Sequence, residues 1–136
     1  MRTFRSIVAA LVAALLVAGV LSTSAVAGSQ PKRIIDEVPP KTNQVSYNAF
    51  KLKGTVTEPQ LDGTVVPYAN QNVKILKKAC GTCTWKTVKK VKTNDNGVFA
   101  TRIYAPERGR WKWRSKVDNS DGYGNTKGEI WTLFFR

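Results

Sequence analysis

The chain has 136 residues, with 22 Lys and Arg against 9 Asp and Glu and no His, which gives a formal net charge of +13 at pH 7. This length fits one compact domain. Without His the chain lacks the commonest general base and the commonest metal ligand, which argues against most hydrolytic and metal-dependent sites.

Residues 1–27 have the three-part pattern of a secretory signal peptide. A positively charged start precedes the apolar run 7–21, and Ala25-Val26-Ala27 forms a small-x-small cleavage motif. A transmembrane span needs about 20 apolar residues, whereas this run has 15 (21 − 7 + 1). We therefore expect a secreted, extracellular mature chain, residues 28–136, that has no membrane span and a net charge of +11 (22 − 2 − 9).

The mature chain changes character near residue 44. Residues 28–43 contain three prolines and no clear periodicity, so we expect an extended or flexible lead-in before a domain at 44–136. From there apolar and polar residues alternate with period two, which predicts β-strands. The predicted strands cover residues 50–56, 73–76, 85–92, 99–103, 110–117 and 130–135. A tight turn is predicted at Asn94-Asp95-Asn96-Gly97.

Alternation also predicts which side chains face the core. Phe50 and Leu52 are expected inside, as are Trp111 and Trp113 in the strand with the clearest alternation. In the third strand, alternation predicts that the side chains of Trp85, Thr87 and Val91 face the core. The last strand, 130–135, has apolar residues on both parities, which predicts a central strand buried on both faces or a terminal strand covered by a partner.

No window after residue 27 has a sustained helical period. Six or seven short strands separated by turns predict an all-β fold, a single antiparallel β-sandwich, with a small barrel as the structural alternative.

Several motifs follow one another in a characteristic order. They are Tyr47 before the first strand, Gly54-Thr55-Val56 in that strand, Trp85, Thr93-x-x-x-Gly97-x-Phe99, and Gly109 to Arg114. In this order residues 44–135 resemble the immunoglobulin-like or prealbumin-like sandwich domains of secreted and surface proteins of Gram-positive bacteria. The resemblance implies a non-catalytic spacer, adhesion module or carbohydrate-proximal accessory.

Cys80-Gly81-Thr82-Cys83 is the most specific local motif. In an exported chain, two cysteines this close are expected to form a disulfide that fixes the hairpin between the second and third strands. A redox pair is the alternative, but that chemistry favours a cysteine at a helix N-terminus, and a strand is predicted here. A metal site would need two more ligands, and the chain has no other Cys and no His, so we expect no metal.

Ten basic residues fall on the outward parity of their predicted strands. They are Lys51, Lys53, Lys74, Lys86, Lys90, Lys92, Arg110, Lys112, Arg114 and Lys116. If the strands align, these residues form a cationic surface for an anionic cell-envelope polymer, a polysaccharide or a partner protein. Nucleic acid is not the expected partner, because the chain is exported and the two core tryptophans point away from the charges.

Other functions stay open from the sequence. A secreted cationic antimicrobial or toxin-like effector is one alternative, and an inhibitor that presents the Cys80–Cys83 loop to a secreted enzyme is another. We expect no enzyme, cofactor or small-molecule substrate, although a Ser-Lys dyad or a carboxylate pair is compatible with the composition. The loop 118–129 is rich in side-chain oxygens that could bind calcium, but Tyr123 stands where the standard motif needs Gly.

Overall fold

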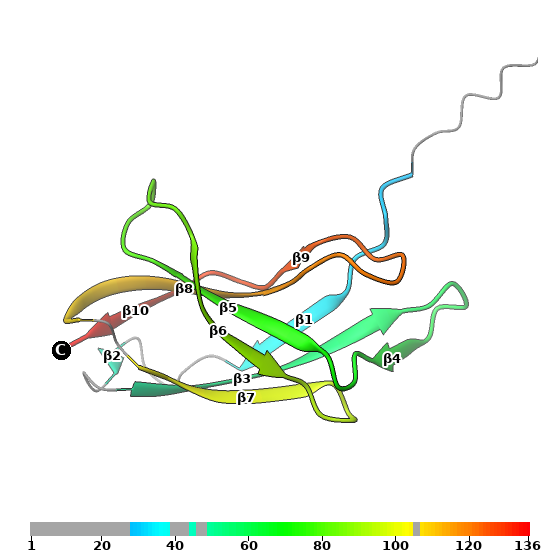
Figure 1. Cartoon of the computed structure of the whole chain (residues 1–136), viewed down its shortest axis with the longest axis horizontal. Coiled ribbons are helices and arrows are strands. Elements are labelled where there is room, and N and C mark those ends of the chain that lie inside the picture. Colours follow the sequence, from blue (N-terminus) through cyan, green and yellow to red (C-terminus); the bar gives the residue numbers. More distant parts are fainter. Residues whose placement is uncertain (1–27, 39–43, 46–48, 105–106) are drawn as a thin grey trace, which may run out of the picture.

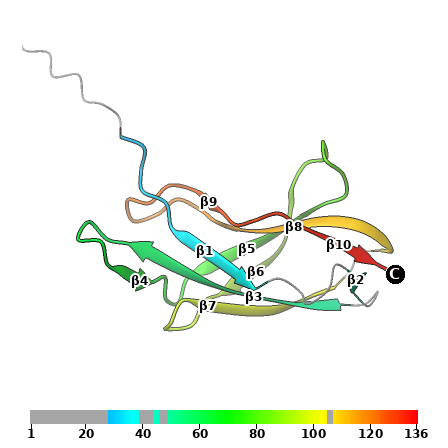
Figure 2. The same ribbon diagram turned by 180° about the vertical axis from the view of Figure 1, so that it is seen from behind.

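The computed structural model describes residues 28–38, 44–45, 49–104 and 107–136. The predicted signal peptide, 1–27, and Tyr47 of the family motif lie outside the described residues. The described part of the chain forms ten β-strands and no helix. The strands build two sheets that face each other in two layers (Figures 1 and 2). The predicted all-β class is therefore confirmed, and the layers fit a β-sandwich.

The first sheet is organised around one long strand, β3 (Ala49–Pro59). β1 (Ile34–Val38) pairs with one edge of β3, and β7 (Val98–Tyr104) and β4 (Val65–Pro67) pair with the other edge. All three pairings are antiparallel.

The second sheet has the order β2-β10-β8-β5-β6. Its strands are β2 (Gln44–Val45), β10 (Trp131–Phe135), β8 (Gly109–Val117), β5 (Asn72–Lys78) and β6 (Lys86–Lys92), and β9 (Thr126–Lys127) also pairs with β8. Only the short β2–β10 pairing is parallel among the described strands.

The segment 28–43, expected as a lead-in, contributes a strand to the first sheet. Ile34 pairs with Thr57 and Val38 pairs with Lys53, so β1 is extended but built into the sheet. Ile35 packs against the core from this strand. The first sheet therefore includes residues that precede the expected domain start at residue 44, because five residues between prolines are too short for a periodic signal.

The core lies between the two sheets. It consists of Phe50, Leu52, Val56, Tyr68, Val73, Ile75, Phe99, Ile103, Trp113, Val117, Leu133 and Phe135. The rings of Phe50, Trp113 and Phe135 meet at its centre, with centroid separations of 5.4, 5.9 and 6.2 Å. The inward positions predicted for Phe50, Leu52 and Trp113 are confirmed, whereas Trp111 is only partly buried at the edge of the core.

β6 departs from the predicted alternation. Its register with β5 shifts between Ile75 and Leu76, so Thr87 pairs with Leu76 while Lys86 pairs with Lys77. A bulge of this kind moves the following side chains to the opposite face of the sheet. Thr87, expected inside, is consequently exposed.

β10 is central in its sheet but covered on one face only. Leu133 and Phe135 lie in the core, whereas Phe134 is 43% exposed and Ile130, just before the strand, is 47% exposed. The interpretation of a strand buried on both faces is therefore wrong for the described residues. Coverage of Phe134 by a partner stays a prediction.

Candidate anionic-ligand surface

Seven of the ten predicted cations lie on the outer face of the second sheet. They are Lys74, Lys90, Lys92, Arg110, Lys112, Arg114 and Lys116. Residues that oppose each other on neighbouring strands project from the same face. Lys78, opposite Lys112, and Lys127, opposite Lys116, therefore join the same surface. These nine residues are called the basic face below.

A row of four cations crosses this face. Lys74 on β5 opposes Lys90 on β6 and Lys116 on β8, and Lys116 opposes Lys127 on β9. Neighbouring strands are only about 4.8 Å apart. Like charges placed directly opposite destabilise a sheet, so the row favours any anion that can span it.

The other three predicted cations lie elsewhere. Lys51 and Lys53 project from the outer face of the first sheet, where Lys51 opposes Arg102. Lys86 opposes Lys77 on the side of the second sheet that bears the core, because of the bulge in the β5–β6 pairing. The structure therefore does not bring the ten residues together on one surface.

Trp85 lies among the cations of the basic face. Lys78 Nζ is 4.9 Å and Arg114 Cζ is 5.3 Å from the centre of its ring. The Arg114 guanidinium is oriented by donating from Nη2 to the Gly128 carbonyl oxygen at 2.9 Å. The sequence pattern predicted that Trp85 faces the core. In the structure Trp85 precedes β6 and is half-buried against these two cations. An aromatic ring between cations offers a contact surface for a ring-shaped or planar part of a ligand.

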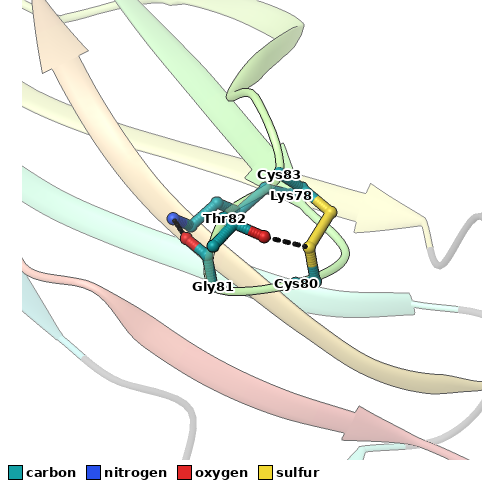
Figure 3. Close-up of a disulfide and its surroundings, with 5 residues drawn as sticks. All are labelled: Lys78, Cys80, Gly81, Thr82 and Cys83. Carbon is teal, nitrogen blue, oxygen red and sulfur yellow. Dashed lines mark hydrogen bonds between the residues drawn. A yellow bond between two sulfur atoms is a disulfide. The ribbon is translucent and has the colours of Figure 1, made fainter.

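The Cys80–Cys83 disulfide is present as predicted, with an S–S distance of 2.06 Å. It closes the loop between β5 and β6, which projects from the sheet in Figure 1, and Figure 3 shows the bridge across the turn. Lys78 Nζ donates to the Gly81 carbonyl oxygen at 2.6 Å, which ties the base of the loop to its tip. The loop therefore positions Trp85, which follows it directly, beside the basic face.

Asp118 places a carboxylate at the middle of the cation row. Its oxygens pair with Lys116 Nζ at 2.8 Å and with Lys74 Nζ. Hydrogen bonds from Lys116 and then from Lys74 hold the pKa of Asp118 below its usual range. A polar cavity of about 300 Å³ lies beside this group, with Lys74, Lys90 and Asp118 in its wall.

Replacing Asp118 by Asn should strengthen polyanion binding, because it removes the carboxylate that competes for Lys74 and Lys116. In the folded protein the pKa of Asp118 is lowered, so its ionised carboxylate stabilises the fold. This stabilisation is fully present above the unfolded pKa of about 3.9, and it is lost as the pH falls through the lower pKa of the folded state. Because this side chain is 41% exposed, the loss of stability at pH 7 should be small, at most about 1 kcal/mol.

Elution from a heparin column and urea unfolding at about pH 7 and pH 2.5 measure the two effects. Asp62→Asn is the matched control, since the pKa of Asp62 is also lowered, by a hydrogen bond from Thr64, but away from the basic face. Later elution of the Asp118 variant alone is expected. Identical elution of the two variants would show that Asp118 does not compete for the row.

Two acidic residues of the loop 118–129, Asp118 and Asp121, have cationic neighbours. Besides the pairs of Asp118, an Asp121 oxygen lies 3.7 Å from Arg33 Nη2. In the described part of the chain, no group of three or more His, Cys, Asp or Glu is placed to hold a metal ion. Likewise, no helix within the described ranges is long and apolar enough to cross a membrane.

Sequence reasoning missed the contributions of Lys78, Lys127 and Arg33. Lys78 continues the outward parity of Lys74, a signal that extending the predicted strand by two residues would have found. Lys127 belongs to a two-residue strand, which is too short for a pattern. Arg33 anchors the loop that bears Asp118, by donating from Nη1 to the Asp118 carbonyl oxygen at 3.3 Å.

Comparison of the chain with protein-family models, curated proteins and solved structures found no significant match.

Proposed function

We propose that the protein is a secreted, non-catalytic module that binds an anionic polymer or protein of the cell envelope through the basic face. The observation that supports this most directly is the gathering of nine cations on the outer face of one sheet. Such a surface attracts polyanions over a long range and binds them in a salt-dependent way.

The arrangement of the cations supports a polymer rather than a single small anion. The row Lys90-Lys74-Lys116-Lys127 runs across the strands, and β8 carries Arg110, Lys112, Arg114 and Lys116 along its length. An extended chain of negative charges can contact either series, whereas one small anion can contact only a few members. Trp85 adds an aromatic surface that a sugar ring of an acidic polysaccharide could contact.

We also propose that the domain is immunoglobulin-like. One sheet of such domains contains the first, second and fifth strands of the family pattern, and the other contains the third, sixth and seventh. The sheet β1-β3-β7 facing β5-β8-β10 supports this order, with β6 as an additional edge strand. The disulfide of this chain lies in the β5–β6 loop and not between the sheets, unlike that of antibody domains.

Four simultaneous Gln substitutions test the basic face. Lys90, Lys92, Arg110 and Lys112 suit this test, because no ion pair or hydrogen bond among the described residues joins their side chains to the rest of the fold. If each residue contacts the polymer, the slope of log Kd against log salt concentration should decrease by about three or more units. Affinity at about 0.1 M salt should fall by about fourfold to several hundredfold, since each of four exposed ion pairs contributes about 0.2–1 kcal/mol.

The matched control replaces Lys32, Lys51, Lys53 and Arg102 by Gln. These residues are exposed and lie off the basic face, and the change in net charge is the same. Binding is measured to envelope fractions of the native host, washed in rising salt. The control should keep the salt slope of the unaltered protein. Equal losses in both variants would mean that net charge, and not this face, determines binding.

A further inference from the structure

A second recognition feature lies at the end of the β5–β6 ribbon. A half-open cavity of about 430 Å³ is lined there by Trp111 from β8, Lys77 from β5, Lys86 from β6 and Cys83 from the disulfide loop. This volume lies within the range of small-molecule sites, about 300–1,000 Å³.

Three lining residues, Lys77, Lys86 and Trp111, lie on the opposite side of the sheet from the basic face, while Lys78 of the basic face also borders the cavity. Lys77 opposes Lys86 on one neighbouring strand and Trp113 on the other, so these side chains project toward the core side. Trp111 shares the parity of Trp113, two residues away. The cavity therefore lies next to the hydrophobic core. The half-buried Trp111 ring packs against the core and also forms a wall of the cavity.

The lining surface is mostly apolar, and the charged residues that border it are lysines. Lys77 Nζ lies 4.8 Å from the centre of the Trp111 ring. Lys78 and Lys86 also line the cavity, and no Asp or Glu of the described ranges does. Lysines that border one cavity without a carboxylate favour a ligand that brings a negative charge. The aromatic wall favours a ligand that also has an apolar surface to cover it.

We propose that this cavity binds a carboxylated sugar ring, such as a uronate unit. The apolar face of the ring packs on Trp111, and the carboxylate accepts hydrogen bonds from the ammonium groups of Lys77 and Lys86. A charge-assisted pair of this type is stronger than a neutral hydrogen bond. The inference goes beyond the proposed function, because this site recognises one ring on the other side of the sheet.

The disulfide loop keeps the cavity formed in the absence of a ligand. Cys83 in the wall is covalently joined to Cys80, and Lys78 Nζ bonds the Gly81 carbonyl oxygen. A wall fixed before binding loses little conformational entropy when the ligand enters.

Calorimetric titration with trigalacturonate tests the proposal. Lys77→Gln and Lys86→Gln should each weaken binding about tenfold, the loss expected when one hydrogen bond to a charged group is removed. Lys90→Gln is the matched control, with the same charge change on the basic face, and it should change Kd less than about twofold. If Lys90→Gln weakens binding as much as Lys77→Gln, binding belongs to the basic face and this proposal is wrong.

Two further ligands separate charge from ring recognition. The methyl ester of trigalacturonate keeps the rings without the charge, and inorganic triphosphate keeps negative charge without a ring. Both should bind at least about tenfold more weakly than the acid, because each lacks one of the two contacts. Equal binding of the ester would overturn the role of the lysines, and equal binding of triphosphate would overturn the role of Trp111.

The Trp111 contact has its own readout. The chain has four tryptophans, so a ¹⁵N spectrum is expected to contain four indole N–H signals, and the signal lost in Trp111→Leu is that of Trp111. Trigalacturonate should shift the Trp111 signal more than those of Trp85 and Trp113. A shift confined to Trp85 would place the sugar on the basic face. Because Trp111 also packs against the core, the lysine variants keep the test decisive if the Leu variant does not fold.

Discussion

Replacing Arg33 by Ala is expected to lower the free energy of unfolding by about 3–5 kcal/mol, the range for removing one partner of a buried ion pair. The stability of a small domain is only about 5–15 kcal/mol, so this single change should remove a large share of it. The Arg33 side chain has no exposed surface, which is rare for a charged residue.

Each nitrogen of the Arg33 guanidinium donates at least one hydrogen bond. Its Nε donates to Glu58 Oε1 at 2.8 Å, and its Nη2 donates to the carbonyl oxygen and the hydroxyl of Ser120 at 3.1 and 2.9 Å. The rings of Tyr68 and Tyr123 lie on it, at 4.4 and 4.8 Å from Cζ. Truncation to Ala would leave the Glu58 carboxylate without this partner. It would also remove the guanidinium that the Tyr68 and Tyr123 rings contact.

The effect should extend to the loop that bears Asp118. Arg33 also donates from Nη1 to the Asp118 carbonyl oxygen, and its backbone N donates to Thr126 Oγ1 at 3.0 Å. These bonds connect the start of the described chain to both ends of the loop. Loss of Arg33 should therefore also alter the Lys74–Asp118–Lys116 group of the basic face.

Urea unfolding measures the prediction, with Lys32→Ala as the control. Lys32 is the exposed neighbour of Arg33, and its substitution changes the net charge equally. The control should change stability by less than about 0.5 kcal/mol, as expected for an exposed surface residue. Arg33→Lys should lie between the two, because it keeps the charge but not the planar donor fork. Similar midpoints for Arg33→Ala and Lys32→Ala would refute a structural role of the buried guanidinium.

The sequence could not identify Arg33 because its partners are distant. Glu58 is 25 residues away and Ser120 is 87 residues away. Local periodicity instead determines which side of its own strand a residue faces, and this is why the core positions of Phe50, Leu52 and Trp113 could be predicted. A buried charge whose partners come from a distant strand and loop leaves no periodic signal.

The positions of the basic residues also could be predicted only in part, because local alternation does not say to which sheet a strand belongs. Alternation correctly separates Lys51 and Lys74 from the core, but it cannot assign them to a sheet. The structure places them on opposite sides of the molecule, because β3 and β5 belong to different layers. The prediction for Lys86 was wrong for another reason. The bulge in the β5–β6 pairing after Ile75 turns Lys86 to the side of the sheet that bears the core. The short-range features, the Cys80–Cys83 bridge among them, could be predicted because both partners lie within a few residues.

The turn at residues 94–97 is a short-range feature that also has a long-range role. Asn94 Oδ1 accepts hydrogen bonds from the backbone N of Asn96 and Val98, at 3.0 and 2.9 Å, which forms the tight turn that the sequence predicts. Gly97 then adopts a φ of +71°, and its carbonyl oxygen accepts a hydrogen bond from Val56 N at 2.9 Å. The turn is therefore joined to the middle of β3.

Gly97→Ala should lower the free energy of unfolding by about 3 kcal/mol or more, the sum of two costs. An L-residue with this φ costs about 1–2 kcal/mol. In addition, the new Cβ would collide with the carbonyl oxygen of Val56 and lie 3.1 Å from Tyr68 N. Both atoms belong to backbone whose hydrogen bond, from Tyr68 N to the Val56 oxygen at 3.0 Å, would have to shift.

Gly63→Ala separates the two costs. Gly63 also has a positive φ, +86°, but a Cβ there would meet no atom within 4 Å. Its variant should lose only the conformational part, about 1–2 kcal/mol, so the difference between the two urea midpoints reports the collision with β3. Equal losses would mean that the turn moves away from Val56 at little cost, and that the contact between this turn and β3 does not hold the first sheet together.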